Sequence, residues 1–188
     1  MRDILELDLC IKGRRSVRSY TDEPVSKEQI EDLLEAGVWT PTAMHREPCK
    51  FIIIEDKKII KYVSDETKKL VQKIMPQRAD RFATPEDIIC YKAPVLILIC
   101  VEKDSQWNNL NLIDSVLAAE NMFLKAHELG LGTCYMGYVC FLNGNPAVLK
   151  KIGVPDNYTM QVPFVLGHPK TKQGAGKRSS PDILKWTK

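Results

Sequence analysis

An unbroken apolar run at residues 94–101, PVLILICV, is the sequence feature that most constrains the fold. It is rich in β-branched residues and predicts a strand. A long helix is expected after it, over residues 109–129, because apolar residues recur there at helical spacing and spread over most of the circumference. Such a helix is buried, either in a core or between subunits. Gly130 follows it, where glycine commonly ends a helix.

The other expected elements alternate irregularly along the chain. The further predicted helices cover residues 3–13, 26–40, 57–75 and 146–153. The further predicted strands cover residues 50–55, 130–139 and 158–166. The interleaving is too irregular for a doubly wound sheet, so the sequence predicts the α+β class.

Several local signals refine this outline. Ser26 and Gln29 have the spacing of a capping box at a helix start. The strand at 50–55 is apolar throughout and should be buried on both faces. Pro163 should place the last strand at a sheet edge or at a bulge. Prolines among many charges predict a mobile cover, or lid, over residues 64–92.

Length and charge exclude several classes of protein. The 188 residues suggest one domain, residues 1–188, with a real core. A net charge of +3 is too small to favour nucleic acid as the main partner. Acids interrupt the N-terminal apolar residues, so they do not form a signal peptide, and no apolar run is long enough to span a membrane. The six cysteines include no C-x-x-C pair, which favours reduced thiols and a cytoplasmic location.

The usual catalytic motifs are missing from the sequence. His45, His127 and His168 have no partners at a recognised ligand spacing, so no metal site is expected. Cys49 or Cys134 could act as a nucleophile with His45, but buried, inert cysteine is the simpler interpretation. There is no G-x-S-x-G elbow and no glycine-rich dinucleotide motif.

A basic stretch after the first helix offers chemistry of another kind. Arg14, Arg15 and Arg18 accompany Ser16 within a few positions, and arginine binds phosphate with several donors. Phosphate binding and a solvated basic turn remain alternatives. In the tail, Lys177 and Arg178 would add cations if it folds back on this stretch; a disordered basic terminus is the alternative.

In chain order, four segments resemble the FMN-dependent nitroreductase family. They are residues 14–20, residues 41–48, residues 118–122 with 130–137, and Gly167-His168-Pro169 with the basic tail. The resemblance implies a single FMN-binding domain whose central, mostly antiparallel sheet is flanked by helices. It also implies an intertwined homodimer with FMN at the subunit interface and residues 167–188 as a C-terminal extension.

The resemblance also implies residue roles. Arg14, Arg15 and Ser16 would hold the FMN phosphate, with help from Lys177 and Arg178. As the catalytic pair, Arg18 would lie by flavin N1 and the C2 carbonyl, and the backbone N–H near Gly137 would face N5. The residues that would reach the flavin from the other subunit are Pro41, Thr42, Ala43 and His45. His45, Glu47 and Cys49 replace the asparagine, glutamine and tryptophan that are frequent in the family.

The activity implied by the resemblance is a two-electron transfer. NADH or NADPH would reduce the flavin through N5, and a nitroaromatic, a quinone or a similar small molecule would then be reduced by a ping-pong mechanism. No metal, nucleic acid or membrane is implied. The alternatives are reductive dehalogenation or flavin fragmentation on the same scaffold, a non-enzymatic FMN-binding or sensing protein, and, remotely, a nucleic-acid-binding module.

Overall fold

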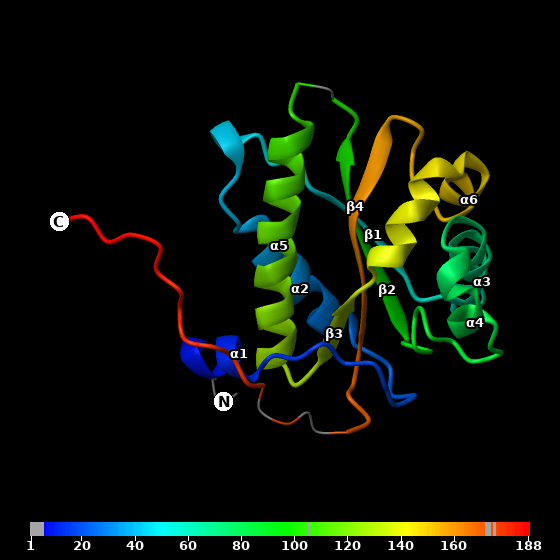
Figure 1. The fold of residues 1–188 in the computed structure, drawn as a ribbon, viewed down its shortest axis with the longest axis horizontal. Helices are drawn as coiled ribbons and strands as arrows, with labels where there is room; N and C mark the ends of the chain where they lie inside the picture. The colour runs from blue at the N-terminus through cyan, green and yellow to red at the C-terminus, as the bar shows by residue number, and fades with distance from the viewer. Residues whose placement is uncertain (1–5, 105, 172–173, 175) are drawn as a thin grey trace.

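A four-stranded antiparallel sheet forms the centre of the molecule, as seen in the computed structural model, which describes residues 6–104, 106–171, 174 and 176–188 (Figure 1). The strands are β1 (Lys50–Ile54), β2 (Val95–Glu102), β3 (Gly132–Tyr135) and β4 (Tyr158–Gly167). They are arranged in the order β1-β2-β4-β3, and every ladder between them is antiparallel. The α+β class and the antiparallel sheet are thus confirmed.

Helices cover both faces of this sheet (Figure 1). On one side lie α1 (Leu7–Gly13), α2 (Lys27–Val38) and α5 (Asn108–Glu128), with the short 3-10 helix η1 (Ala43–His45) beside α5. On the other side lie α3 (Lys57–Ile74), η2 (Pro76–Arg78), α4 (Ala79–Phe82), η3 (Gly137–Gly144) and α6 (Pro146–Lys151).

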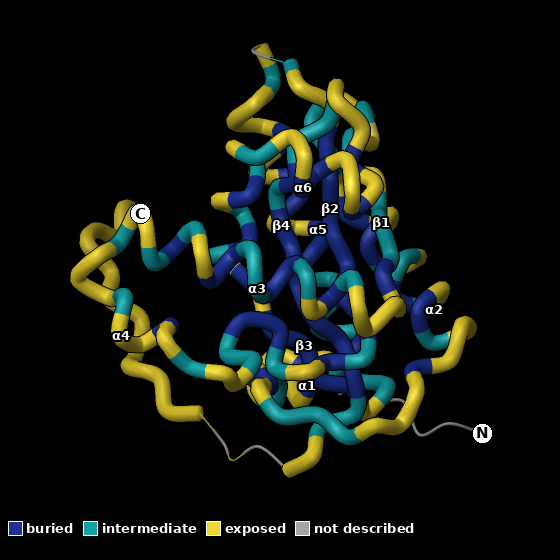
Figure 2. The backbone as a smooth tube through the Cα atoms, turned by 90° about the vertical axis from the view of Figure 1, so that its right-hand side faces the viewer, coloured by how far each residue is buried: buried dark blue, intermediate teal, exposed yellow. Residues whose placement is uncertain are grey.

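The strand β2 connects the two resulting cores. Its side chains alternate between faces. Val95, Ile97 and Ile99 pack with α2 and α5, whereas Leu96 and Leu98 pack with α3 and η3. Figure 2 shows that the buried backbone is concentrated in the sheet. The prediction of a strand at 94–101 is confirmed by β2, and helices cover both of its faces.

Local capping explains where two of the helices begin. The Ser26 side chain accepts a hydrogen bond from the Gln29 backbone N–H, and the Gln29 side chain accepts one from the Ser26 N–H, so the predicted capping box is present. Asn145 caps α6 by accepting from the Val148 N–H, and a proline follows it. These bonds satisfy N–H groups that have no partner within the helix.

Two strand predictions were partly wrong. The strand β4 is interior rather than at an edge, and the irregularity in its pairing with β2 lies between Ile99 and Cys100. Pro163 is tolerated because β3 ends opposite Phe164, and only the Pro163 carbonyl is needed there, accepting from Met136 N–H at 2.8 Å. The strand β1 lies at the sheet edge, so three of its apolar side chains are only half-buried, although both of its faces pack against helices.

The predicted strand at 130–139 is shorter than expected. It covers only Gly132–Tyr135, and the chain then enters η3 at Gly137. The first predicted helix begins at Leu7, and the part of that prediction that falls on residues 3–5 lies outside the described residues. In the part of the chain that the structure describes, no helix has the length and apolar character needed to cross a membrane.

Candidate functional site

The basic stretch lies directly beside β3. Val17 N–H donates to the Thr133 carbonyl at 2.9 Å, and Ser16 forms a parallel bridge with Thr133. This close approach requires a glycine, because a Cβ at Gly132 would lie 2.5 Å from the Val17 side chain. The stretch is therefore held as an additional short extended segment at the sheet edge.

Two cavities lie on either side of this junction. The first, of about 490 Å³, is lined by Arg14 and Arg15 together with His127 and Thr133. The second, of about 770 Å³, is lined by Arg18 and by residues 134–138, which include Gly137. Both volumes lie in the range typical of small-molecule sites. The arginines of the stretch are thus divided between two cavities.

Arg14 carries a buried donor that lacks an acceptor. Its Nε atom is buried without a hydrogen-bond partner, although the Glu120 carboxylate lies 3.3 Å away as an ion-pair partner. The distance suits charge pairing, but the alignment does not make a hydrogen bond. A buried N–H without an acceptor is costly by about 1–3 kcal/mol, so an anion in the first cavity would fit this group. The residues present therefore fit a phosphate.

Arg15 holds the C-terminal tail against the basic stretch. Its guanidinium donates to the Gly174 carbonyl at 3.1 Å and to the Lys12 carbonyl at 2.8 Å, and it lies against Gly176. The tail therefore does fold back on this stretch. The predicted residues Lys177 and Arg178 follow this contact but are exposed, and neither lines the cavity.

His127 joins the first cavity from the end of α5. Its ring packs on Gly13, where a Cβ would lie 2.5 Å from Nε2. Burial lowers the pKa of His127, and the positive charges of Arg14 and Arg15 lower it further. No sequence signal places His127 with these arginines, because the contact joins residues far apart in the chain.

The second cavity combines Arg18 with an aromatic wall. Tyr91 from the predicted cover segment, together with Tyr135, Tyr138 and Phe141, lines it. Gly137 is the first residue of η3, so its backbone N–H has no partner within that helix. The cover residues that line this cavity are Arg81, Phe82, Thr84, Glu86, Ile88, Ile89 and Tyr91.

Ser16 lies apart from Arg14 and Arg15 on this junction. Its hydroxyl contacts the Cys134 thiol, which lines the second cavity. Burial raises the pKa of Cys134, while Arg18 and the Ser16 hydroxyl oppose that effect. The thiol is therefore protonated at neutral pH, which agrees with the prediction of an inert cysteine.

The loop at 41–48 is fixed to α5, far from these arginines. The Asp114 carboxylate, only 4% exposed, accepts from Ala43 N–H at 3.2 Å. Arg46 donates to Asn111 Oδ1 at 3.0 Å and stacks over Trp107 at 4.5 Å. Within the loop, residues 44, 45 and 47 have positive φ values, which marks strained backbone.

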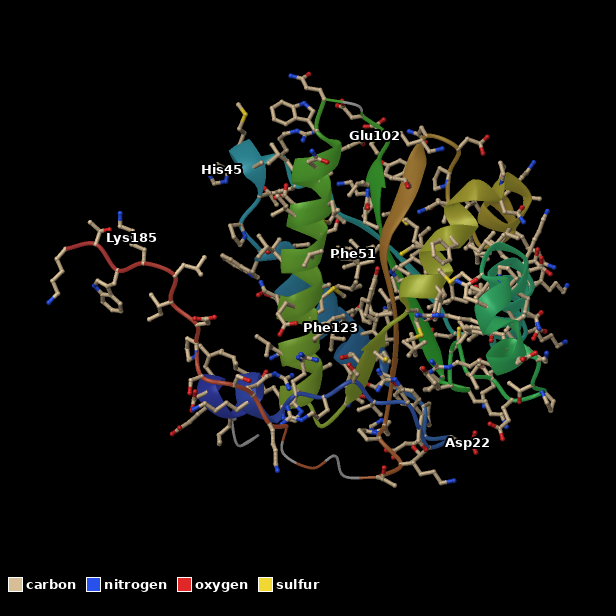
Figure 3. All side chains as sticks on the ribbon, viewed as in Figure 1. Asp22, His45, Phe51, Glu102, Phe123 and Lys185 are labelled. Atoms are coloured by element: carbon tan, nitrogen blue, oxygen red, sulfur yellow. The ribbon has the colours of Figure 1, made fainter. Side chains whose placement is uncertain are left out.

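The structure does not bring this loop and the basic stretch together within one chain. Asp114 holds the loop, and His127 packs on Gly13, 13 residues later along α5. At a rise of about 1.5 Å per residue, that separation is about 20 Å. Figure 3 likewise shows His45 at the upper end of α5, and the tail with Lys185 projects from the same side of the molecule. Pro41, Thr42, Ala43 and His45 therefore lie away from Arg14 and Arg18.

In the ranges 6–104, 106–171, 174 and 176–188, no three His, Cys, Asp or Glu side chains gather as metal ligands would. The six cysteines are all unpaired.

Known proteins share this fold and sequence pattern. A crystal structure of a nitroreductase with bound FMN from Bacteroides fragilis superposes with a TM-score of 0.82 at 26% identity, covering 97% of this chain and 98% of that one. An Archaeoglobus fulgidus protein whose name pairs NADH dehydrogenase with NAD(P)H nitroreductase is 27% identical over 96% of this chain and 100% of its own length. An FMN reductase from Bacillus subtilis is 28% identical over 85% of this chain and 64% of its own length. The model of the nitroreductase family matches residues 11–168, so the chain belongs to the nitroreductase family.

Proposed function

We propose that this protein is an FMN-dependent oxidoreductase that takes two electrons from NADH or NADPH and passes them to a small organic acceptor. The observation that carries the proposal is the division of the basic stretch, which sends Arg14 to one cavity and Arg18 to another. Membership of the nitroreductase family and the FMN bound to the Bacteroides fragilis nitroreductase support it.

Arg14 and Arg15 form the phosphate end of the proposed site, whereas the predicted phosphate ligand Ser16 directs its hydroxyl to Cys134 of the second cavity. The unpartnered Nε of Arg14 gains an acceptor when phosphate binds. Arg15 presents its charge in the same cavity while also fastening the tail. Lys177 and Arg178 follow the fastened segment and add positive charge near this end of the site. A planar guanidinium is well suited to phosphate because it donates two parallel hydrogen bonds.

Arg18 and Gly137 form the ring end. Bound FMN supplies the two-electron chemistry through its N5 atom. Arg18 would hold a positive charge where the ring system gains electron density, which would stabilise the reduced cofactor. The Gly137 N–H, which η3 leaves without a partner, would donate toward N5. The aromatic wall of the second cavity stacks flat acceptors such as nitroaromatics and quinones.

A homodimer completes the site in this proposal. The outward face of α5 exposes apolar side chains that a single chain leaves uncovered: Leu112 is 45% exposed, Ile113 53%, Val116 52% and Leu117 42%. The opposite face of the same helix is buried in the core. A contiguous exposed apolar surface of this kind is typical of a protein–protein interface.

The geometry of α5 explains how a second copy would complete the site. A two-fold axis that crosses α5 midway between Asp114 and His127 would pair the helix with its copy in antiparallel orientation. The loop at 41–48 of one chain would then face the basic stretch of the other. Pro41, Thr42, Ala43 and His45 would reach the cofactor that Arg14 and Arg18 of the partner chain hold. The exposed apolar residues of the tail, Leu184 and Trp186, would cover further surface of that partner.

The test is the visible absorption of the purified protein after loading with FMN, followed by titration with NADH and NADPH in the absence of oxygen. Bound flavin that either nicotinamide reduces supports the proposal. A protein that retains flavin but is reduced by neither would be a binding or sensing protein instead. We also place the protein in the cytoplasm, because its cysteines are all unpaired.

A further inference from the structure

A strained turn delivers Tyr91 to the second cavity. Tyr91 and Lys92 both have a φ of 54°, in the left-handed region that bulky residues avoid. Holding residues there costs about 1–3 kcal/mol each, so the surrounding structure must fix them. Tyr91 lines the same cavity as Arg18 and Gly137. The strained turn therefore places the Tyr91 phenol at the proposed ring end of the site.

The Asp87 carboxylate fixes this turn. It accepts from Cys90 N–H at 2.8 Å, from Lys92 N–H at 3.0 Å and from Ile89 N–H at 3.2 Å. The hydroxyl of Ser64, 1% exposed on α3, donates to the same carboxylate at 2.6 Å. One side chain thus satisfies three backbone donors and ties the turn to a core helix.

Few contacts hold the Arg18 side chain in place among the described residues. Within the described ranges, its guanidinium donates one hydrogen bond, to the Ser16 carbonyl at 3.4 Å, close to the limit for such a bond. In the described part of the chain, no carboxylate lies within ion-pair distance of Arg18. Its charge is therefore free to act on a ligand, but its side chain needs a partner to fix its direction.

The Tyr91 hydroxyl is the candidate partner. Tyr91 and Arg18 line the same cavity, and the phenol and the guanidinium interact electrostatically. Burial raises the pKa of Tyr91, and the smaller opposing effect of Arg18 does not reverse this, so the phenol stays neutral. A neutral acceptor can orient a guanidinium without cancelling its charge, whereas a carboxylate would cancel it.

We propose that Tyr91 is a positioning residue, which orients Arg18 toward the flavin ring and leaves its charge available to stabilise the reduced cofactor. The inference rests on the proposed function. It assigns to the cover segment a role in tuning the redox potential, in addition to covering the cavity.

The test compares the midpoint potential of bound FMN in the wild type and in Tyr91→Phe. This variant keeps the ring and its packing but removes the hydroxyl. Without the hydroxyl, Arg18 loses the acceptor that orients it, so its hydrogen bond to the reduced ring should weaken and the preference for reduced over oxidised FMN should fall by about tenfold. For a two-electron couple this corresponds to a fall of about 30 mV. Affinity for oxidised FMN should stay near the wild-type value.

Tyr138→Phe is the matched control. The Tyr138 hydroxyl belongs to the same cavity wall but accepts from Arg78 at 2.7 Å. Its removal should leave the potential at the wild-type value. In an Arg18→Ala background, Tyr91→Phe should cause no further fall, because its effect acts through Arg18.

Three outcomes overturn the inference: an unchanged potential in Tyr91→Phe, an equal fall in Tyr138→Phe, or an equal fall in the Arg18→Ala background. Thermal melting of each variant shows whether the fold is retained. Failure of the wild type to bind FMN would contradict the proposed function itself, and is distinct from loaded protein whose potential does not respond.

Discussion

Replacing Asp87 with asparagine should loosen the turn that carries Tyr91. Asp87 accepts four hydrogen bonds in the structure, from Ser64 Oγ and from three backbone N–H groups. An asparagine has one acceptor oxygen, and its amide group would present a donor where the backbone also donates. At least the bond from Lys92 N–H is lost, and the others lose their charged acceptor.

The loss in the free energy of unfolding can be worked out from these four hydrogen bonds. A hydrogen bond to a charged group contributes about 1.5–3 kcal/mol, compared with about 0.5–1.5 kcal/mol for a neutral one. One lost bond and several weakened ones sum to about 3 kcal/mol. That is a large part of the total stability of a domain, which is about 5–15 kcal/mol. The strain at Tyr91 and Lys92 adds to the tendency of the turn to open.

Urea unfolding and amide hydrogen exchange together measure this effect. The free energy of unfolding of Asp87→Asn should fall by about 3 kcal/mol, and the amides of Ile89, Cys90 and Lys92 should exchange faster. Asp56→Asn is the control, because Asp56 caps α3 through one bond to Lys58 N–H at 2.7 Å, and asparagine caps helices equally well. Equal unfolding free energies for the two variants, with unchanged exchange in the turn, would refute the reasoning.

Two further predictions concern the dimer and the phosphate end. Val116→Glu should raise the dissociation constant of the dimer at least about a hundredfold, because it buries an unpaired charge twice per interface. Sedimentation of this variant should therefore show monomers. As a control, Ile74→Glu changes an exposed position on the opposite layer, and this variant should stay dimeric. A Val116→Glu protein that remains a dimer would exclude the α5 interface. Sulfate should raise the pKa of His127 in an NMR titration of cofactor-free protein, because an anion offsets the Arg14 and Arg15 charges that help to lower it. Since the bound state takes up a proton, sulfate affinity should rise as the pH falls toward and below 6.5, the ordinary pKa from which that of His127 is lowered. In Arg14→Gln the pKa of His127 should start higher and respond less, and a sulfate-independent pKa in the wild type would contradict an anion site there.

Regular elements were predictable because their signals are local. The capping box at Ser26 and the β-branched run in β2 each depend on neighbouring residues, and both were confirmed. The place of Pro163 was not predictable in this way. Whether a missing N–H matters there depends on where β3 ends, and that strand pairs with β4 from a distant part of the chain.

The same difference between local signals and long-range contacts applies to the residues of the site. Its arginines were visible in the sequence because they are clustered, and their chemistry does not depend on the fold. His127 and Tyr91 were not visible as site residues, because each enters a cavity through contacts between distant segments. The left-handed conformation of Tyr91 also has no glycine to mark it. The width of the apolar pattern on α5 did indicate a buried helix, but one chain alone leaves Leu112, Ile113, Val116 and Leu117 exposed.

The most direct test of the proposed function is the anaerobic reduction of bound flavin. Purified protein loaded with FMN and freed of excess cofactor should show flavin absorption bands. These bands should bleach on addition of one equivalent of NADH or NADPH, and they should return when a quinone or nitroaromatic is added. A protein that retains no flavin after loading would contradict the account.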